Sequence, residues 1–531
     1  MARGMSAAFS ICCKSGSSGA RDVRVHAHDD LRRRAGAHLL DHCSVAWARD
    51  AGDGRDDFPK MSHSTQTTLS DPADIAVLAE FAAAVDVGSL PTDLVNTAKA
   101  CLLYGLAVGI GTRRARPALL AAAASGEDES AQAATRFLDG RRTSHGSAAF
   151  ANAVLLSGRV QGDSHPCGHI GGVVIPATLA AAERAGIAGK PMVSALVAAY
   201  EVALRTGRDH AADLSKRGFR TTPCYGVFGA AVAAGRAQGF DGNTMANAIG
   251  LAANFAGGLR EYVDAGSEES PFQAGFAARN GLYVADLAAQ GLNAARTALH
   301  GNAGFYRAFA EEGIDYGKRL VDGLGTHFEF TTVTYKEYPA CQFLRGLIRG
   351  LAALRARAEG AAPQSIELRM NPYEADFIGV RYAGPFTSAT QTVMSASFCA
   401  ALAWATGTAS FDGMRTFNDE AVLALIPRIT LVSDDARARY GPLMRVHLSN
   451  GSVLQWEEQA GDSNYRVTWD AAVRMTRQLC DEVEVPSSLA TALIERAANI
   501  DDERSVAPLI SAVSAAARVR GRAGTKYFRP Q

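Results

Sequence analysis

The chain has 531 residues, which is too long for one ordinary core and predicts two domains. Its 54 Lys and Arg residues balance 54 Asp and Glu residues, so no broad field would gather nucleic acid or an anionic membrane. No apolar run reaches the roughly 18 uninterrupted residues of a membrane span, so we expect a soluble protein with neither partner.

Residues 1–66 differ in composition from the rest of the chain. They contain an arginine run at 32–34, several aspartates between 50 and 57, and little apolar periodicity. Such a segment buries too little apolar surface to offset the entropy of ordering, so we predict a disordered N-terminal extension. Met61 offers a native start, and we favour an upstream start codon assigned in error.

From residue 71 onward the apolar pattern becomes helical, after a Ser-Asp-Pro opening at 70–72 that suits a helix N-terminus. The helical segments that follow are rich in alanine and glycine, which lets helix axes approach closely. They comprise residues 94–110, 147–158, 175–185, 191–205, 227–238, 244–256 and 276–290. We therefore predict an all-helical domain over residues 67–330, with a crevice between the loops that join its helices.

Beyond residue 330, β-branched and aromatic residues predict strands. The predicted strands are residues 330–335, 365–370, 426–432, 444–448 and 453–456. The last two flank Asn450 and Gly451, the pair preferred where both central turn residues need positive φ. Together with predicted helices at 344–357 and 392–405, these strands indicate an α+β lid domain over residues 331–460.

The chain returns to a helical pattern at 469–484 and 487–498. We predict that residues 461–525 dock back onto the first domain. The predicted fold class is mostly α: a large all-helical domain plus a smaller α+β lid. A cleft between such parts is a common place for a small ligand.

Residues 162–172 (GDSHPCGHIGG) stand directly before the helix predicted from residue 175. Glycine bares backbone N–H groups at a helix start, which makes this loop a natural receptor for a carboxylate. Asp163, His165 and His169 supply proton donors and acceptors that titrate in a useful range. The chain has no GxxxxGK[ST], HExxH or GxSxG motif.

Three interpretations of this loop remain open. The first is acid–base chemistry on a small organic acid, and the second is that the histidines only cap helices and bond carbonyl groups. The third is a transition-metal site formed by His165, Cys167 and His169 at a spacing of two. We favour the first, because Pro166 and Gly168 break the extended geometry that the metal site needs.

The nine cysteines are scattered over apolar segments without a CxxC pair. This pattern is typical of reduced thiols and not of a disulfide framework or an iron–sulfur site. We therefore expect a cytoplasmic protein.

Several segments, taken in their order and spacing, resemble the MmgE/PrpD family of methylcitrate dehydratases and cis-aconitate decarboxylases. They are residues 150–153, 165–166, 169–176, 226–231, 274–278, 300–305 and 336–341. The resemblance runs from about residue 70 to 520. It implies a helical body, an α+β lid, a homodimer, and action on di- and tricarboxylates without metal or organic cofactor.

The resemblance also indicates site residues. His169 falls where a family active-site histidine lies and is our first choice for proton transfer. Family members carry an aspartate-rich loop before the His-Pro pair, where this chain has Arg159 and, displaced by a few positions, Asp163. The catalytic candidates are thus His169, Asp163, His165 and, as a loose match to a lid tyrosine, Tyr373.

Two further family positions are changed in this chain. A second family histidine corresponds to the segment around Arg220, and a family lysine aligns with Ser270, three residues before Gln273. A planar guanidinium binds a carboxylate in two-pronged fashion, so arginines are natural clamps. The predicted substrate-binding residues are Arg159, Arg220, Arg260, Ser270, Gln273 and Lys336.

A proton on carbon next to a carboxylate leaves only if preorganised cations and N–H donors match the growing charge. We therefore expect a cofactor-independent lyase, of dehydratase or decarboxylase type, acting on a small di- or tricarboxylate such as a 2-methylcitrate-like acid. The first alternative is an epimerase or isomerase of a small dicarboxylate resembling iminodisuccinate. The second is a catalytically silent family member that binds a small acid.

Overall fold

A computed structural model of the chain describes residues 73–519, apart from 129, 131–132, 311–313, 318 and 460. All described elements belong to one compact unit, residues 67–531. The predicted extension at 1–66, the helix opening at 70–72 and residues 520–525 lie outside the described residues.

Helices dominate the first part of this unit. They are α1 (Ala73–Ala84), α2 (Thr92–Thr112), α3 (Arg116–Ala124), α4 (His145–Ser157), α5 (Gly171–Ala185), α6 (Gly189–Gly207), α7 (Ala211–Lys216), α8 (Thr221–Ala237), α9 (Gly242–Ala252), α10 (Tyr262–Ala265), α11 (Ser270–Ala289) and α12 (Phe305–Phe309). A short hairpin of β1 (Ala133–Thr135) and β2 (Arg142–Ser144) precedes α4.

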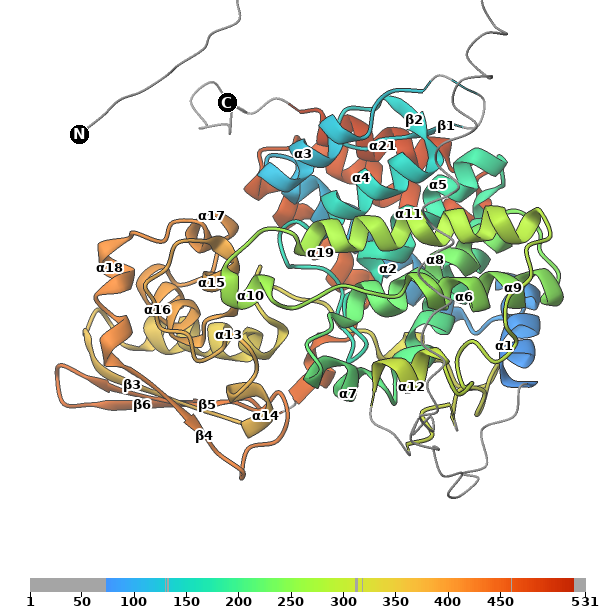
Figure 1. The fold of residues 1–531 in the computed structure, drawn as a ribbon. Helices are drawn as coiled ribbons and strands as arrows, with labels where there is room; N and C mark the ends of the chain where they lie inside the picture. Colours follow the sequence, from blue (N-terminus) through green and yellow to red (C-terminus); the bar gives the residue numbers. More distant parts are fainter. Residues whose placement is uncertain are drawn as a thin grey trace, which may run out of the picture. The chain divides into compact units, whose positions relative to one another are not determined.

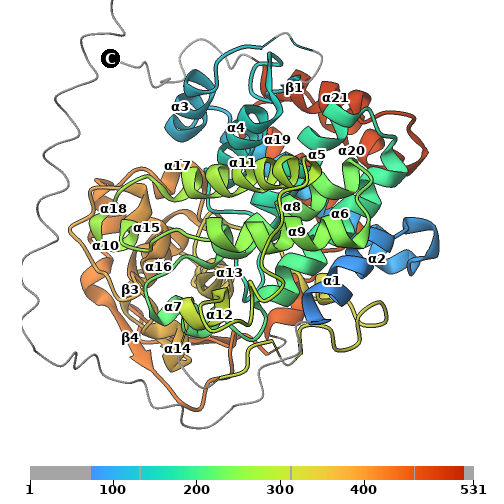
Figure 2. The same ribbon diagram turned by 45° about the vertical axis from the view of Figure 1, so that its right-hand side comes forward.

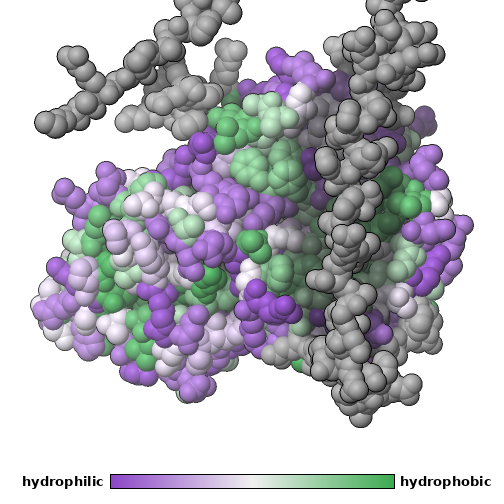
Figure 3. Space-filling view, in the orientation of Figure 1, coloured by the Kyte–Doolittle hydropathy of each residue, from purple (hydrophilic) through white to green (hydrophobic). Residues whose placement is uncertain are grey.

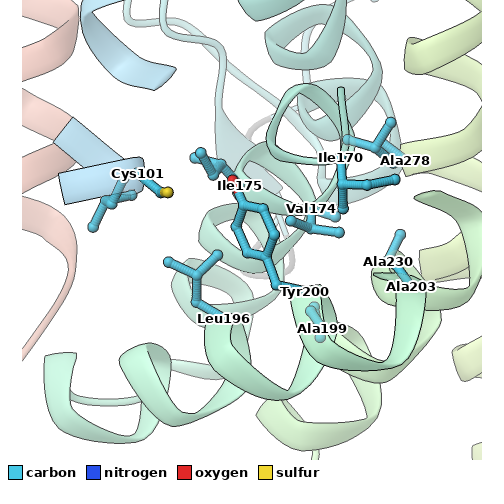
Figure 4. Packing of buried hydrophobic residues seen from close by; sticks show 14 of the residues in the cluster. Cys101, Ile170, Val174, Ile175, Leu196, Ala199, Tyr200, Ala203, Ala230 and Ala278 are labelled. Carbon is cyan, nitrogen blue, oxygen red and sulfur yellow. The ribbon is translucent and has the colours of Figure 1, made fainter. Parts of the chain in front are cut away.

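Helix α8 lies at the centre of this part and packs against α5, α6 and α11. The long helix α11 crosses α8 in both views of the ribbon (Figures 1 and 2). A Cβ added at Gly229 of α8 would lie 2.5 Å from a Val174 methyl and 2.6 Å from the Ala199 carbonyl oxygen. The glycine is therefore required by the close approach of three helices, and small side chains such as Ala203 and Ala230 fill the same layer (Figure 4).

The second part contains a four-stranded mixed sheet in the order β4-β3-β5-β6. Its strands are β3 (Pro363–Met370), β4 (Ile429–Ser433), β5 (Leu443–Leu448) and β6 (Val453–Glu457), and only the β3–β4 pair is parallel. Ile366, Leu368 and Met370 of β3 alternate into a second hydrophobic core. Helices α13 (Arg345–Arg357) and α16 (Ala396–Thr406) cover the sheet, as Figure 1 shows.

The remaining helices connect or follow the sheet. They are α14 (Pro372–Ala375), α15 (Ala389–Met394), α17 (Phe411–Met414), α18 (Glu420–Leu423), α19 (Trp469–Glu482), α20 (Ser487–Ala498) and α21 (Ala507–Ala517). Helices α19, α20 and α21 pack against α2, so the chain returns to the helical part after the sheet.

The predicted fold class is confirmed: the protein is mostly helical with a small mixed sheet in its C-terminal part. The predicted strand at 330–335 is wrong, because Glu329–Thr332 is a 3-10 turn and Thr334 makes only single bridges to Ser164 and Arg466. The predicted helix at 392–405 is interrupted at Ser395, whose hydroxyl accepts from Phe398 N–H and starts α16. The domain boundaries at 330 and 460 stay predictions.

Helix α2 is long and apolar enough, by length and composition, to cross a membrane. However, 78% of its most apolar window is buried inside the protein. A core helix of a soluble protein passes the same test, so this helix is weak evidence for a membrane span. No other helix within the described ranges meets both criteria.

One face of α11 exposes large apolar side chains. Phe276 is 46%, Tyr283 64% and Leu287 39% exposed, at spacings of seven and four residues along the helix. Green, apolar atoms appear over α11 where grey atoms do not cover this side of the molecule (Figure 3).

Candidate active site

A cavity of about 260 Å³ lies between the helical part and the part that contains the sheet. Seven of the ten predicted site residues line it: His165, His169, Arg220, Arg260, Ser270, Lys336 and Tyr373. Residues far apart in sequence thus meet at one cavity, as shared chemistry requires. The other three, Arg159, Asp163 and Gln273, do not line it.

The imidazole of His169 is held in a defined tautomer. Its Nδ1 lies 2.6 Å from the backbone carbonyl oxygen of Asp163, which can only accept, so Nδ1 carries the hydrogen. The other nitrogen, Nε2, is 3.3 Å from Lys336 Nζ and accepts from it. Burial, Lys336, Arg220 and Arg260 hold the pKa of His169 well below its ordinary value. His169 is therefore a neutral ring at pH 7, and Nε2 is the ring nitrogen that carries the free lone pair.

Asp163 lies behind this histidine and not in the cavity. Its carboxylate accepts from the Gly171 N–H at 3.0 and 3.1 Å and from the Tyr200 hydroxyl at 3.0 Å. Burial raises the pKa of Asp163 to about 6. The sequence predicted that the N–H groups at this helix start bind a substrate carboxylate. The Gly171 N–H instead holds the protein's own carboxylate, and Asp163 positions His169 through its carbonyl oxygen.

Gly171 is required by this arrangement. A Cβ at that position would lie 2.2 Å from the Tyr200 hydroxyl oxygen and 2.9 Å from the Asp163 carboxylate oxygens. Any larger residue would displace the carboxylate that caps α5. Glycine at position 171 therefore leaves room for the Tyr200 hydroxyl group and the Asp163 carboxylate.

Lys336 is only 1% exposed, and its Nζ donates to the Val160 carbonyl oxygen at 2.8 Å. Val160 has φ +55°, a left-handed conformation that is strained for a β-branched residue. The strained residue is thus the one whose carbonyl oxygen accepts the hydrogen bond from Lys336. Burial lowers the pKa of Lys336 to about 7.

Arg220 and Arg260 extend the positive charge around His169. Arg220 donates to the Ser270 carbonyl oxygen at the start of α11, and the Arg260 guanidinium lies 4.4 Å from the centre of the Phe377 ring. Neither of these arginines, nor Lys336, has an ion-pair partner within the part of the chain that the structure describes. These three cations are therefore available to an anionic ligand.

Two further arginines line the cavity, and the sequence analysis did not select them. Arg208 donates to Glu329 at 2.8 Å, and Arg439 donates to Glu374 at 3.1 Å. No Asp or Glu side chain within the described ranges lines the cavity. The wall is thus strongly positive in a protein of zero net charge, which favours a ligand with more than one carboxylate.

His165 holds the turn that presents His169. Its Nδ1 accepts from the Cys167 N–H at 3.1 Å, and its Nε2 faces Glu329 at 3.7 Å. Burial lowers the pKa of His165. His165 and Arg208 lower the pKa of Glu329 to about 2. The ring of His165 also lines the cavity, so it remains a candidate for proton transfer.

Two predicted substrate-binding residues serve the structure instead. Arg159 donates to Gln161 at 2.8 Å, the Gly111 carbonyl oxygen at 3.1 Å and Glu482 at 2.7 Å. Its guanidinium thereby ties the chain just before the loop at residues 162–172 to α2 and α19. Gln273 donates to the Leu259 carbonyl oxygen at 2.9 Å outside the cavity.

Tyr373 lines the outer part of the cavity and is 40% exposed. Arg439 stacks over its ring at 4.1 Å, and Phe343 meets the ring edge-on at 5.9 Å. No motif marks Arg439 or the neighbouring Tyr440, so only the tertiary fold brings them to the wall.

The side chains of His165, Cys167 and His169 do not converge on one point, as a three-ligand metal site would require. The Cys167 thiol donates to the Leu204 carbonyl oxygen at 3.2 Å, while His165 and His169 face Glu329 and Lys336. In the described ranges, no three or more His, Cys, Asp or Glu side chains are grouped to share a metal ion.

The protein is thus mostly helical, and a buried neutral histidine and several cations meet at one cavity. Residues 76–316 match the MmgE/PrpD N-terminal domain. The chain therefore contains the N-terminal domain of the MmgE/PrpD family.

Its relatives include a cis-aconitate decarboxylase of Aspergillus terreus, 27% identical over 297 residues, which are 53% of this chain and 60% of that protein. A cis-aconitate decarboxylase-like protein of Aspergillus oryzae is 26% identical over 295 residues, 53% and 61% of the two chains. The cis-aconitate decarboxylase of Homo sapiens is 28% identical over 203 residues, 36% and 41%. The chain thus spans about 60% of the length of the Aspergillus relatives it matches.

Proposed function

We propose that the protein is a lyase acting on a small di- or tricarboxylate, with carboxy-lyase chemistry as the first choice. The relatives named cis-aconitate decarboxylase support the reaction type. The observation that carries the proposal is His169, whose unprotonated Nε2 meets a cavity lined by three cations that have no acidic partner among the described residues.

In the proposed reaction, Arg220, Arg260 and the protonated form of Lys336 bind the substrate carboxylates. His169 Nε2 takes a proton from a carbon next to one carboxylate, and the cations stabilise the carbanion that forms. That anion expels a β-hydroxyl in a dehydration. In a decarboxylation, the C–COO⁻ bond breaks, CO2 leaves, and the carbon that keeps the electron pair takes a proton.

The test is proton exchange in heavy water, followed by NMR over a panel of hydroxy, unsaturated and amino di- and tricarboxylates. We expect at least one acid to exchange a carbon-bound proton and to lose water or CO2. His169→Gln should lower the rate by about 100-fold or more, the usual contribution of a general base. His447→Gln, on the exposed side of β5, is the matched control and should not change it. Full turnover by His169→Gln would overturn the proposal.

An epimerase is the second candidate. Two histidines, His165 and His169, line the cavity, and an epimerase needs bases that reach opposite sides of one carbon. The positions occupied by Arg220 and Ser270 differ from the family pattern, which also allows a changed reaction. Deuterium incorporation without loss of water or CO2 would favour this function. Binding of an acid without any exchange would indicate a silent family member.

We also propose a homodimer in the cytoplasm. The exposed apolar face of α11 supports a partner, because Tyr283 and its neighbours are otherwise left in water. The molar mass by light scattering at micromolar concentration tests the dimer, and a monomer would contradict it.

A further inference from the structure

The ε-amino group of Lys336 has two hydrogen-bond acceptors. They are the Val160 carbonyl oxygen at 2.8 Å and His169 Nε2 at 3.3 Å, and no carboxylate pairs with the amine in the described ranges. An ammonium group has three N–H donors, whereas a neutral amine has two donors and one lone pair. The two acceptors can take both N–H groups of a neutral amine, which leaves its lone pair for the cavity that Lys336 lines.

On balance, burial and the neighbouring charges also favour the neutral amine of Lys336. Burial disfavours its cation most, Arg220 and Arg345 oppose it, and only the Cys341 thiol and Asp163 favour it. The pKa of Lys336 is thereby lowered to about 7, so the neutral amine and the ammonium are both populated near neutral pH. A buried amine in this condition is a nucleophile, as in lysines that form imines.

We propose that Lys336 is a covalent site for small oxo acids, which it binds as an imine. Arg220 and Arg260 would hold the carboxylates of such an acid, because neither has an acidic partner of its own in the described ranges. The inference goes beyond the proposed lyase activity and does not rest on it. It assigns a nucleophilic role to a residue that otherwise serves as a cation.

The chemistry balances with the residues of the cavity. The Nζ lone pair forms a C–N bond to the keto carbon, the carbonyl π electrons move to oxygen, and the nitrogen loses a proton to His169 Nε2, 3.3 Å away. The protonated His169 gives this proton to the alkoxide, which becomes the hydroxyl group of a neutral carbinolamine. His169 then passes the remaining N–H proton to that hydroxyl group, the C–O bond breaks, and water leaves as the C=N bond forms. The sum is ketone plus amine giving imine plus water, and no oxidant or reductant takes part.

The test uses the full chain with 2-oxoglutarate and sodium borohydride, which reduces an imine to a stable secondary amine. Intact mass should show one adduct per chain, and peptide mapping should place it on Lys336. Lys99 is the internal control, because its ammonium pairs with Asp501 at 2.5 Å and should stay unlabelled. Succinate has the two carboxylates but no ketone, so it should form no adduct.

Variants separate this role from the lyase activity. Lys336→Arg keeps a cation at the cavity but should lose the adduct, and its thermal unfolding should show that it folds. His169→Gln should form the adduct at least ten-fold more slowly, because the proton acceptor is missing. Absence of an adduct from about pH 6 to about pH 9, or labelling that persists in Lys336→Arg, would overturn the proposal. Either result leaves the exchange test of the lyase unaffected.

Discussion

The hydroxyl group of Tyr200 lies 3.0 Å from the carboxylate of Asp163, and both side chains are buried. Asp163 in turn fixes the hydrogen on His169 Nδ1 through its carbonyl oxygen. Tyr200 never reaches the cavity, yet it supports the residue that orients the base. Figure 4 shows Tyr200 pointing from α6 toward α5, the helix that follows the loop at residues 162–172.

Tyr200→Phe tests that support. The variant removes one buried hydrogen bond to a charged group, so we expect a loss of about 1.5–3 kcal/mol in the free energy of unfolding. The rate constant kcat should fall less than in His169→Gln, because the base is still present. Urea unfolding and the NMR signal of the His169 Nδ1 hydrogen measure both effects. Unchanged stability and an unchanged signal would show that the hydroxyl supports nothing.

Arg260→Ala tests the cationic clamp. We expect KM to rise about 10- to 100-fold, because a charge-assisted hydrogen bond to a carboxylate contributes about 1.5–3 kcal/mol. Arg355→Ala, on the exposed side of α13, is the matched control and should leave KM unchanged. Steady-state kinetics with the acid found in the exchange test provide the measurement. Equal effects in the two variants would contradict a specific role of Arg260.

Arg159→Met tests the structural role of an arginine that the sequence assigned to the substrate. The variant breaks a buried pair with Glu482, so we expect a loss of about 3 kcal/mol in stability and little change in KM. Glu482→Gln should cost less, since an amide oxygen still accepts from the guanidinium. A double-mutant cycle by urea unfolding measures the coupling. A raised KM with unchanged stability would return Arg159 to the binding site.

The raised pKa of Asp163 predicts a pH dependence of stability. A carboxyl group whose pKa is about 6 when folded, against 3.8 ordinarily, binds more protons in the folded state between these values. Its contribution is fully present below the lower value and is lost as the pH rises through about 6. Relative to Asp163→Asn, the wild type should therefore lose about 3 kcal/mol between about pH 4 and pH 7.

Glu329 provides the opposite sign for comparison. Its pKa is lowered to about 2, so its contribution is present above its ordinary value of 4.5 and is lost as the pH falls through about 2. Urea unfolding of Asp163→Asn and Glu329→Gln at several pH values separates the contributions of these two carboxyl groups to stability. Parallel stability curves for the wild type and Asp163→Asn would contradict the assignment to Asp163.

The regular elements could be predicted because their apolar periods are local. Helix α20 begins and ends at the predicted residues, and Asn450 and Gly451 mark the hairpin between β5 and β6. The structure of residues 330–335 could not be predicted in this way. Their composition favours a strand, but the neighbouring segments pair with them only through isolated bridges. Thr334 pairs in single bridges with Ser164 and Arg466, which lie far from it in sequence.

The site was predictable where a motif carried it. His169 and Lys336 stand in recognisable segments, and both line the cavity. Arg159 shows where local reasoning ends: it directly precedes the loop, but Glu482 draws its guanidinium away from the cavity. Arg439 shows the reverse, because no sequence pattern marks it and the fold alone brings it to the wall.

The single bridges of Thr334 to Ser164 and Arg466 join the loop at residues 162–172 to segments from the middle and the end of the chain. A nascent polypeptide that ends before residue 466 therefore lacks both Arg466 and Glu482, the partner of Arg159 just before that loop. The segment at residues 159–172 can therefore be fixed in place only late in the synthesis of the chain on the ribosome. Separately expressed halves would need to recombine before this segment could take up the same arrangement.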